Sequence, residues 1–317
     1  IGMKFGLWFE PEMISPDSDL YREHPDWAIH IDEREGVQSR NQMGLDLSRD
    51  EVCEYVINAV SDILANANIE YVKWDMNRQL TDMPRLGYNH EYTLGYYKIM
   101  SAITEKFPNI LFEGCSAGGG RFDAGVLAYM PQIWTSDNSD AIARLKMQYS
   151  TSMCYPVYSI SSHVTASPNH QCGRVTSLKT RADVAYCGTF GYELDVTKMS
   201  DEEFEEIKAQ IEFEKRIQDL MCDGDLYRLI NPYETNYCSW EVISKDKKHI
   251  FVMACKVLAV AQTKREKVKL QGLDVNKRYR NMLTGKVYSG DFLMYHGIRV
   301  NYEMKDFSTV VFEFAEI

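Results

Sequence analysis

Two aspartates follow predicted β-strands directly, at positions where an enzyme could place catalytic carboxyl groups. Asp75 ends a short predicted strand over 71–74 that is rich in β-branched and aromatic residues. In parallel-barrel enzymes the catalytic groups lie at the carboxyl ends of strands. The positive charge of Lys73 would favour the ionised form of Asp75, which suits a nucleophile or an electrostatic stabiliser. From these residues alone, an ordinary surface ion pair at a strand end is an equally good interpretation.

The second candidate carboxyl lies in the segment WTSDNSD over 134–140. Asp137 follows a predicted strand over 132–135 and precedes a predicted helix, so it occupies the same layer as Asp75. Asp140 competes with it, because an acid at the start of a helix makes a good N-cap. Hydrolysis of a glycosidic bond needs two carboxyl groups that face one bond. The spacing favours Asp137 over Asp140 and leaves both open. We expect burial or the neighbouring charge of Asp75 to keep the acid partner protonated.

A glycine-rich segment, EGCSAGGGR over 113–121, follows another predicted strand. Its glycines would let the backbone approach a ligand closely, or would form a tight turn that packs a helix on the sheet. A second glycine stands where a nucleotide-binding loop needs lysine, which disfavours a phosphate site. His163 and His170 lack the spacing of metal ligands, and we interpret them as hydrogen-bonded loop residues.

Composition restricts the class of protein. The 317 residues are 45% hydrophobic and 26% charged, as in a globular protein with a full core. Thirty-five basic residues against 46 acidic ones give a net charge of −11, which argues against nucleic acid as a partner. The chain contains no apolar run that is long enough for a membrane span. Its eight cysteines show no CxxC spacing, which favours reduced, mostly buried thiols in a cytoplasmic protein.

Strands and helices alternate along the first two thirds of the chain. We count six β-α units and expect a (β/α)8 TIM barrel that is incomplete at its N-terminus, with the other two units upstream. A helix is predicted from Ser48, which we interpret as its N-cap in a capping box with Glu51. After about residue 223 the pattern changes to short strands, which predicts a small antiparallel β domain. The predicted domains are a catalytic barrel over 1–222 and a β domain over 223–317.

Several of these segments together resemble the family 36 α-galactosidases, which are glycoside hydrolases. The resemblance extends over nearly the whole predicted barrel. The matching segments are KFGLWFEPEM (4–13), RNQMGLDLSR (40–49), YVKWDMNR (71–78), EGCSAGGGRFDAG (113–125), WTSDNSDAIARLK (134–146), HVTASPNHQ (163–171) and FGYELDV (190–196).

The resemblance implies a retaining exo-glycosidase that releases terminal α-D-galactose from melibiose- or raffinose-type oligosaccharides by double displacement. It implies no metal or organic cofactor, and a homo-oligomer for the full-length protein. Asp75 matches the family's nucleophile and Asp137 its acid/base. The positions that match the lining of the galactose pocket are Trp8, Arg40, Lys73, Asn77 and Cys115.

The sequence also departs from the family pattern. Ala117 and Ser139 stand where Ser or Gly and Thr are usual. A tandem aspartate motif that grips the outer hydroxyls of galactose, and a large N-terminal β domain, have no counterpart in these residues. Two alternatives therefore stay open: a catalytically incompetent fragment of such an enzyme, and a transglycosylating or α-N-acetylgalactosaminidase relative.

Overall fold

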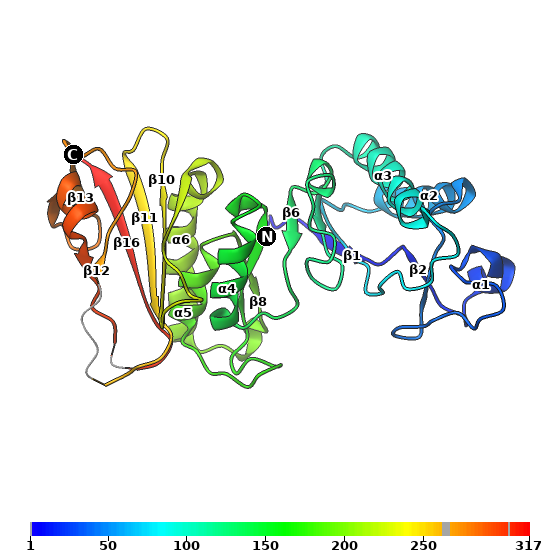
Figure 1. Cartoon of the computed structure of the whole chain (residues 1–317), viewed down its shortest axis with the longest axis horizontal. Helices are drawn as coiled ribbons and strands as arrows, with labels where there is room; N and C mark the ends of the chain where they lie inside the picture. Colours follow the sequence, from blue (N-terminus) through cyan, green and yellow to red (C-terminus); the bar gives the residue numbers. More distant parts are fainter. Residues whose placement is uncertain (1, 262–266, 304) are drawn as a thin grey trace. The chain divides into compact units, whose positions relative to one another are not determined.

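The computed structural model describes residues 2–261, 267–303 and 305–317 (Figure 1). By its internal contacts the chain divides into two compact units, Ile1–Asp137 and Asn138–Ile317. The predicted domain boundary at residue 222 stays a prediction.

The first unit is built on four parallel strands in the order β1-β4-β5-β6. Helices α2 and α3 lie side by side in the connections between them (Figure 1). A two-stranded antiparallel ribbon, β2 with β3, follows the first strand. The elements of this unit are β1 (Gly6–Phe9), β2 (Met13–Ile14), α1 (Asp19–Glu23), η1 (Pro25–Trp27), β3 (Met43–Gly44), α2 (Asp50–Asn66), β4 (Tyr71–Trp74), α3 (Tyr88–Lys106), β5 (Leu111–Gly114), η2 (Val126–Ala128) and β6 (Gln132–Trp134).

The core of this unit lies between the helices and one face of the strands. Helix α2 buries Val52, Val56 and Val60 at the predicted helical spacing, against a cluster that includes Trp74 and Phe112. The opposite face of the strands carries polar side chains, and these belong to the candidate site.

The predicted N-cap of α2 is wrong. Arg49 occupies the cap position, and no side chain caps the helix by a hydrogen bond. The hydroxyl of Ser48 instead donates to Asp46 Oδ1 over 2.6 Å. Asp46 also accepts from the Ser48 N–H, so the local turn at Asp46 outcompetes the capping box.

The second unit continues the alternation with two further parallel strands, β7 and β8, and then changes to an antiparallel sheet. The order in that sheet is β14-β13-β16-β11-β10-β9, beside a separate β12-β15 ribbon. Its elements are α4 (Ala141–Thr151), η3 (Val157–Ser159), β7 (Ile160–Thr165), α5 (Leu178–Ala185), β8 (Thr189–Glu193), η4 (Val196–Lys198), α6 (Asp201–Asp223), β9 (Asp225–Ile230), β10 (Tyr237–Ile243), β11 (His249–Lys256), β12 (Lys267–Val268), β13 (Arg278–Asn281), β14 (Val287–Ser289), η5 (Phe292–His296), β15 (Ile298–Arg299) and β16 (Ser308–Glu316).

These elements confirm the predicted fold class. Six parallel strands alternate with helices in chain order, as expected for an incomplete (β/α)8 barrel, and an antiparallel β domain follows. The strands β2, β3, β9, β14 and β15 and the π-helical turn η5 were not predicted. Of these strands, β2, β3 and β15 have two residues each, too short for a period-two pattern to stand out.

Candidate active site

The strand register brings four of the predicted site residues onto one face of the first unit, namely Trp8, Lys73, Asp75 and Cys115. Trp8 pairs with Lys73, and Lys73 pairs with Glu113 on the next strand. Because side chains two residues apart share a face, Asp75 lies on the same side as Lys73, one step beyond the end of β4. Cys115 follows β5 in the same way, and its N–H donates to the Trp74 carbonyl over 2.7 Å.

Asp75 is 6% exposed and accepts several hydrogen bonds. Trp8 Nε1 donates to its Oδ2 over 3.2 Å and Asn77 Nδ2 to the same oxygen over 2.7 Å. The Met76 N–H donates to Oδ1 over 2.8 Å. The thiol of Cys115 also donates to this carboxylate. Trp8, Asn77 and Cys115 were all predicted site residues, and all three meet at Asp75.

These contacts keep Asp75 in its ionised form. Burial raises the pKa of Asp75, but the hydrogen bonds from Cys115, Asn77, Trp8 and the Met76 N–H outweigh it, so the pKa lies below its ordinary value. The expected direction is correct, but the expected cause is not the leading one. Lys73, from which we expected the effect, has its ammonium 3.3 Å from Glu113.

The thiol of Cys115 acts in this site as a neutral donor. Burial, and then its bond to Asp75 and the charge of that carboxylate, raise the pKa of Cys115 to about 12. A thiol with such a pKa is protonated at neutral pH and is a poor nucleophile. Its place in the site is therefore to stabilise the Asp75 carboxylate.

Glu10 is a site residue that sequence analysis missed. Its Oε1 accepts from the Asn77 N–H over 3.0 Å and from Asn77 Nδ2 over 2.8 Å, and Arg40 Nη1 lies 3.9 Å from it. Glu10 thus fixes the side chain that holds Asp75 and also faces the predicted Arg40. It follows β1 directly, so the strand-end argument used for Asp75 could have found it.

Arg40 stands at the tip of a tight two-residue turn. Ser39 and Gln42 exchange both backbone hydrogen bonds, and the residues between them, Arg40 and Asn41, have φ of 56° and 60°. Positive φ at both central positions defines a turn that favours Asn and Gly, so arginine there is strained. The turn presents the guanidinium group with its side chain mostly exposed.

Asp137 is positioned by the loop that precedes it and by the glycine-rich segment. Trp134 Nε1 donates to Asp137 Oδ1 over 3.1 Å, and the Lys73 ammonium lies 4.6 Å from the centre of the Trp134 ring. The Asp137 side chain is exposed. The burial that we expected around the acid is therefore absent from this chain.

The glycines of the segment over 113–121 allow two loops to touch. A Cβ added at Gly118, where φ is +87°, would come within 2.7 Å of Ser136 Cα, and one at Gly119 within 2.8 Å of the Thr135 carbonyl. The Gly119 N–H donates to that carbonyl over 3.0 Å. Of the two interpretations from sequence, these contacts favour the packing one, since the glycines set the path of the chain that leads to Asp137.

Asp140 is the N-cap of α4, which is the structural role that the sequence also allowed for it. Its side chain caps α4 by accepting from the Ala143 N–H over 2.9 Å, and Arg174 Nη1 donates to it over 2.8 Å. Asp140 is 4% exposed. Both of these contacts lie within the second unit and fix the start of the helix.

Two family descriptions match the chain. The Melibiase family matches residues 1–224, and the glycosyl hydrolase family 36 C-terminal domain matches residues 237–314. The chain belongs to the Melibiase family. The predicted resemblance to family 36 α-galactosidases is thereby confirmed.

Relatives of this Melibiase family member are α-galactosidases of greater length. The α-galactosidase AgaA of Geobacillus stearothermophilus is 48% identical over 100% of this chain and 44% of its own length. The α-galactosidase Mel36A of Lactobacillus acidophilus is 46% identical over 100% of this chain and 44% of its own length. The chain thus spans less than half the length of these relatives.

Solved structures of the family have the same fold. The galactosidase domain of AgaSK superimposes with a TM-score of 0.97 at 45% identity, over 100% of this chain and 44% of that domain's chain. A variant of AgaA in complex with raffinose also gives a TM-score of 0.97, at 47% identity, over 100% of this chain and 45% of that chain. The incomplete barrel and the β domain are therefore those of family 36.

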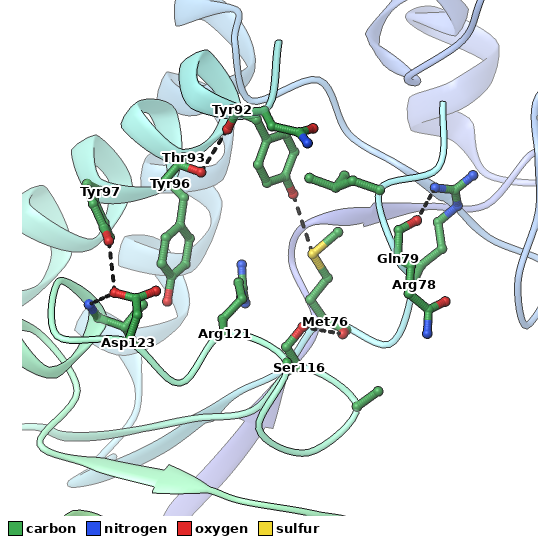
Figure 2. Close-up of a pocket in the computed structure, with 15 residues that line it drawn as sticks. Met76, Arg78, Gln79, Tyr92, Thr93, Tyr96, Tyr97, Ser116, Arg121 and Asp123 are labelled. Carbon is green, nitrogen blue, oxygen red and sulfur yellow. Dashed lines mark hydrogen bonds between the residues drawn. The ribbon is translucent and has the colours of Figure 1, made fainter. Parts of the chain in front are cut away.

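A cavity of about 470 Å³ lies in the first unit beside the candidate site. Figure 2 shows three tyrosines of α3 in its wall: the Tyr97 hydroxyl points to Asp123, Tyr96 lies beside Arg121, and the Tyr92 hydroxyl points to Met76. None of the predicted site residues lines the cavity. It shares two loops with the site, because its lining residues Met76 and Ser116 are the chain neighbours of Asp75 and Cys115.

An ion pair between the buried Glu12 and the partly buried Arg121 lies at the wall of this cavity. Glu12 accepts from Trp74 Nε1 over 2.7 Å, from the Tyr92 hydroxyl over 2.7 Å and from Arg121 Nη1 over 2.8 Å. Burial lowers the pKa of Arg121, but the charge of Glu12 outweighs it and keeps the guanidinium protonated. The pair ties α3 and the glycine-rich loop to the end of β1.

The remaining chemistry-bearing side chains have local partners. His163 Nδ1 lies 3.1 Å from Glu193 Oε2, in agreement with a hydrogen-bonded role.

All eight cysteines are free thiols, and five of them are buried. In the described ranges, no three His, Cys, Asp or Glu side chains gather in a group that could hold a metal ion. No described helix combines the length and apolar character that a membrane crossing needs.

Proposed function

We propose that this chain carries the catalytic carboxyl groups of a retaining exo-glycosidase that hydrolyses terminal α-D-galactosyl residues. The observation that carries the proposal is the environment of Asp75. Four donors hold an ionised carboxylate at the end of β4, in a family member whose relatives are α-galactosidases. A carboxylate with a lowered pKa is the form that a glycosidase nucleophile needs.

The mechanism has two displacements. Asp75 attacks the anomeric carbon, the bond from that carbon to the leaving oxygen breaks, and Asp137 gives its proton to that oxygen. In the second step Asp137 takes a proton from water, the water oxygen attacks the same carbon, and the ester bond to Asp75 breaks. Two inversions give net retention. This chemistry needs the two carboxyl groups about 5–5.5 Å apart.

The other predicted residues surround the galactosyl group in this proposal. Trp8 is 51% exposed and offers a ring surface to a sugar while its indole N–H holds Asp75. Lys73 and Arg40 supply N–H donors to hydroxyl groups, whereas Asn77 and Cys115 keep the nucleophile oriented. The substrate class is α-galactoside oligosaccharides, since an AgaA variant has been solved with raffinose bound. No metal or organic cofactor is needed. A homo-oligomer and a cytoplasmic location stay predictions.

The decisive experiment is the Asp75→Ala variant with azide. Removing the nucleophile should lower turnover of an aryl α-galactoside by about 10⁴-fold or more. Azide should restore part of the rate and give β-galactosyl azide, because the small anion attacks from the side that the carboxylate has left. An unchanged rate in Asp75→Ala, or rescue that yields the α-azide, would contradict the assignment.

The assay also tests the two alternatives. We would compare the 317-residue chain with a longer polypeptide that contains it. Turnover by the longer polypeptide alone would support an incompetent fragment. Transfer of galactose to added sugars, or acceptance of a 2-acetamido group, would instead favour a transglycosylating or α-N-acetylgalactosaminidase activity.

A further inference from the structure

A row of paired side chains runs across four strands just below the predicted catalytic carboxylate. The register joins Trp8 to Lys73, Lys73 to Glu113, and Glu113 to Gln132. Register partners in a sheet lie on the same face, so these four side chains form one layer. Asp75 and Cys115 begin the next layer, two residues further along β4 and β5. Of the row, Glu113 and Gln132 are the members for which neither sequence nor family resemblance gave a role, and Glu113 is the charged one.

Glu113 is completely buried, and its two oxygens have different partners. The Tyr71 hydroxyl donates to Oε2 over 2.7 Å, and Gln132 Nε2 donates to the same oxygen. The Lys73 ammonium lies 3.3 Å from Oε1. Two neutral donors therefore fix the carboxylate in place, and its other oxygen faces the lysine. Burial and the negative charge of Glu113 together raise the pKa of Tyr71, so that phenol stays a donor.

Lys73 needs such an anchor if it is to act on a ligand. A lysine ammonium is a point charge on a flexible four-carbon stem, and its three N–H donors can point in any direction. Here the ammonium is held by Glu113 on one side and by the face of Trp134 at 4.6 Å on another, while a quarter of the side chain stays exposed. Asp75 lies on the same face of β4 two residues further along, and its carboxylate must remain available for attack.

We propose that Glu113 is a positioning residue that holds the Lys73 ammonium toward galactose hydroxyls and away from the nucleophile. The inference rests on the proposed function, because it takes Lys73 as a contact to the galactosyl group. Glu113 itself touches no substrate. It acts through Lys73, and it should have no effect on binding once Lys73 is gone.

A double-mutant cycle on galactose affinity tests this. The variants are Lys73→Met, Glu113→Gln and the double variant, and the dissociation constant for D-galactose is measured by calorimetry. We expect Lys73→Met to weaken binding about 100-fold and Glu113→Gln about tenfold. The double variant should match Lys73→Met alone, because the effect of Glu113 passes through the lysine. Glu241→Gln makes the same change at a buried glutamate of the C-terminal sheet and should leave the affinity unchanged.

The outcomes separate the inference from the function on which it rests. If Lys73→Met binds galactose as the unmutated chain does, or if the unmutated chain does not bind it, the proposed function is contradicted at this site. If Lys73→Met weakens binding but Glu113→Gln does not, the inference alone is overturned. If the two fold-losses of affinity multiply in the double variant, the inference is also overturned, because Glu113 would then act on binding independently of Lys73, through a structural role. Should Glu113→Gln fail to fold, Glu113→Asp keeps the charge on a shorter side chain and completes the cycle. Its affinity should be lower than that of the unmutated chain by less than tenfold, and the variant that combines it with Lys73→Met should match Lys73→Met alone.

Discussion

Strand β5 of the first unit and strand β10 of the second each bury a glutamate completely, and the two carboxyl groups have opposite surroundings. Glu113 faces Tyr71, Gln132 and the Lys73 ammonium. Glu241 accepts the Gln271 N–H over 2.8 Å at Oε2, and no ion pair to Glu241 forms within the described residues. Burial raises the pKa of Glu241 to about 8, so it is uncharged at neutral pH.

The difference shows what a buried carboxyl group needs in order to stay charged. Removing a carboxylate from water is costly unless hydrogen bonds and an opposite charge replace the lost hydration. The face of β5 supplies both and lies below the candidate active site. The face of β10 supplies one donor to Glu241 and no opposite charge in the described residues, so the acid keeps its proton. Charge is thus kept where the chemistry is expected.

The largest effect should come from a third buried glutamate, Glu12, which has the strongest set of partners. In the variant Glu12→Ala, Arg121, Trp74 and Tyr92 lose their acceptor, and the guanidinium is left unpaired. We expect the free energy of unfolding to fall by about 5 kcal/mol, the upper end for a broken buried ion pair. Urea denaturation followed by tryptophan fluorescence measures this. A loss below about 1 kcal/mol would mean that these partners stabilise little.

Glu241→Gln should give a large effect of the opposite sign at high pH. The pKa of Glu241 is about 8 when folded and 4.5 ordinarily, so the unfolded chain releases this proton first. The stability of the unmutated protein therefore falls as pH rises from about 4.5 to 8 and then levels off. The variant lacks this loss and should be about 5 kcal/mol more stable at pH 9, with little difference at pH 4. Thermal unfolding across that range measures it, and parallel stability curves for the two proteins would refute it.

The same substitution at Glu113 should destabilise the chain. Glu113→Gln removes the charge opposite Lys73 and brings an amide group toward the Tyr71 hydroxyl and Gln132. We expect a loss of about 2 kcal/mol at neutral pH, in the range for hydrogen bonds to a charged group. Tyr71→Phe is the matched control, because it removes one neutral donor and should cost about half as much. A gain in stability for Glu113→Gln would show that the two glutamates do not differ in the way described.

Sequence patterns were sufficient for the alternation of strands and helices in the incomplete barrel and for some of the residues at the ends of these elements. Asp75 and Asp140 follow from strand-end and helix-start positions, which depend on a few neighbouring residues. The partners of these residues could not be predicted in the same way. That Glu113 stands beside Lys73 depends on the register of β4 against β5, which the long connection through α3 leaves open. The left-handed turn at Arg40 likewise violates the local preference of arginine, so no local rule points to it.

The smallest expected change in stability concerns two serines that share one sequence pattern at the start of a helix. Ser48 and Ser200 each precede a helix and have an acid three residues later. Only Ser200 forms the capping box: its Oγ accepts from the Glu203 N–H over 3.3 Å, and Glu203 Oε2 accepts from the Ser200 N–H over 3.0 Å. Ser200→Ala should therefore lower the free energy of unfolding by about 1 kcal/mol, and Ser48→Ala by about half as much or less, because Ser48 caps no helix. Hydrogen exchange should increase in the first turn of α6 in Ser200→Ala and stay unchanged in the first turn of α2 in Ser48→Ala. Equal losses in the two variants would mean that the signature itself, and not the bonds that form, determines the stability of these helix starts.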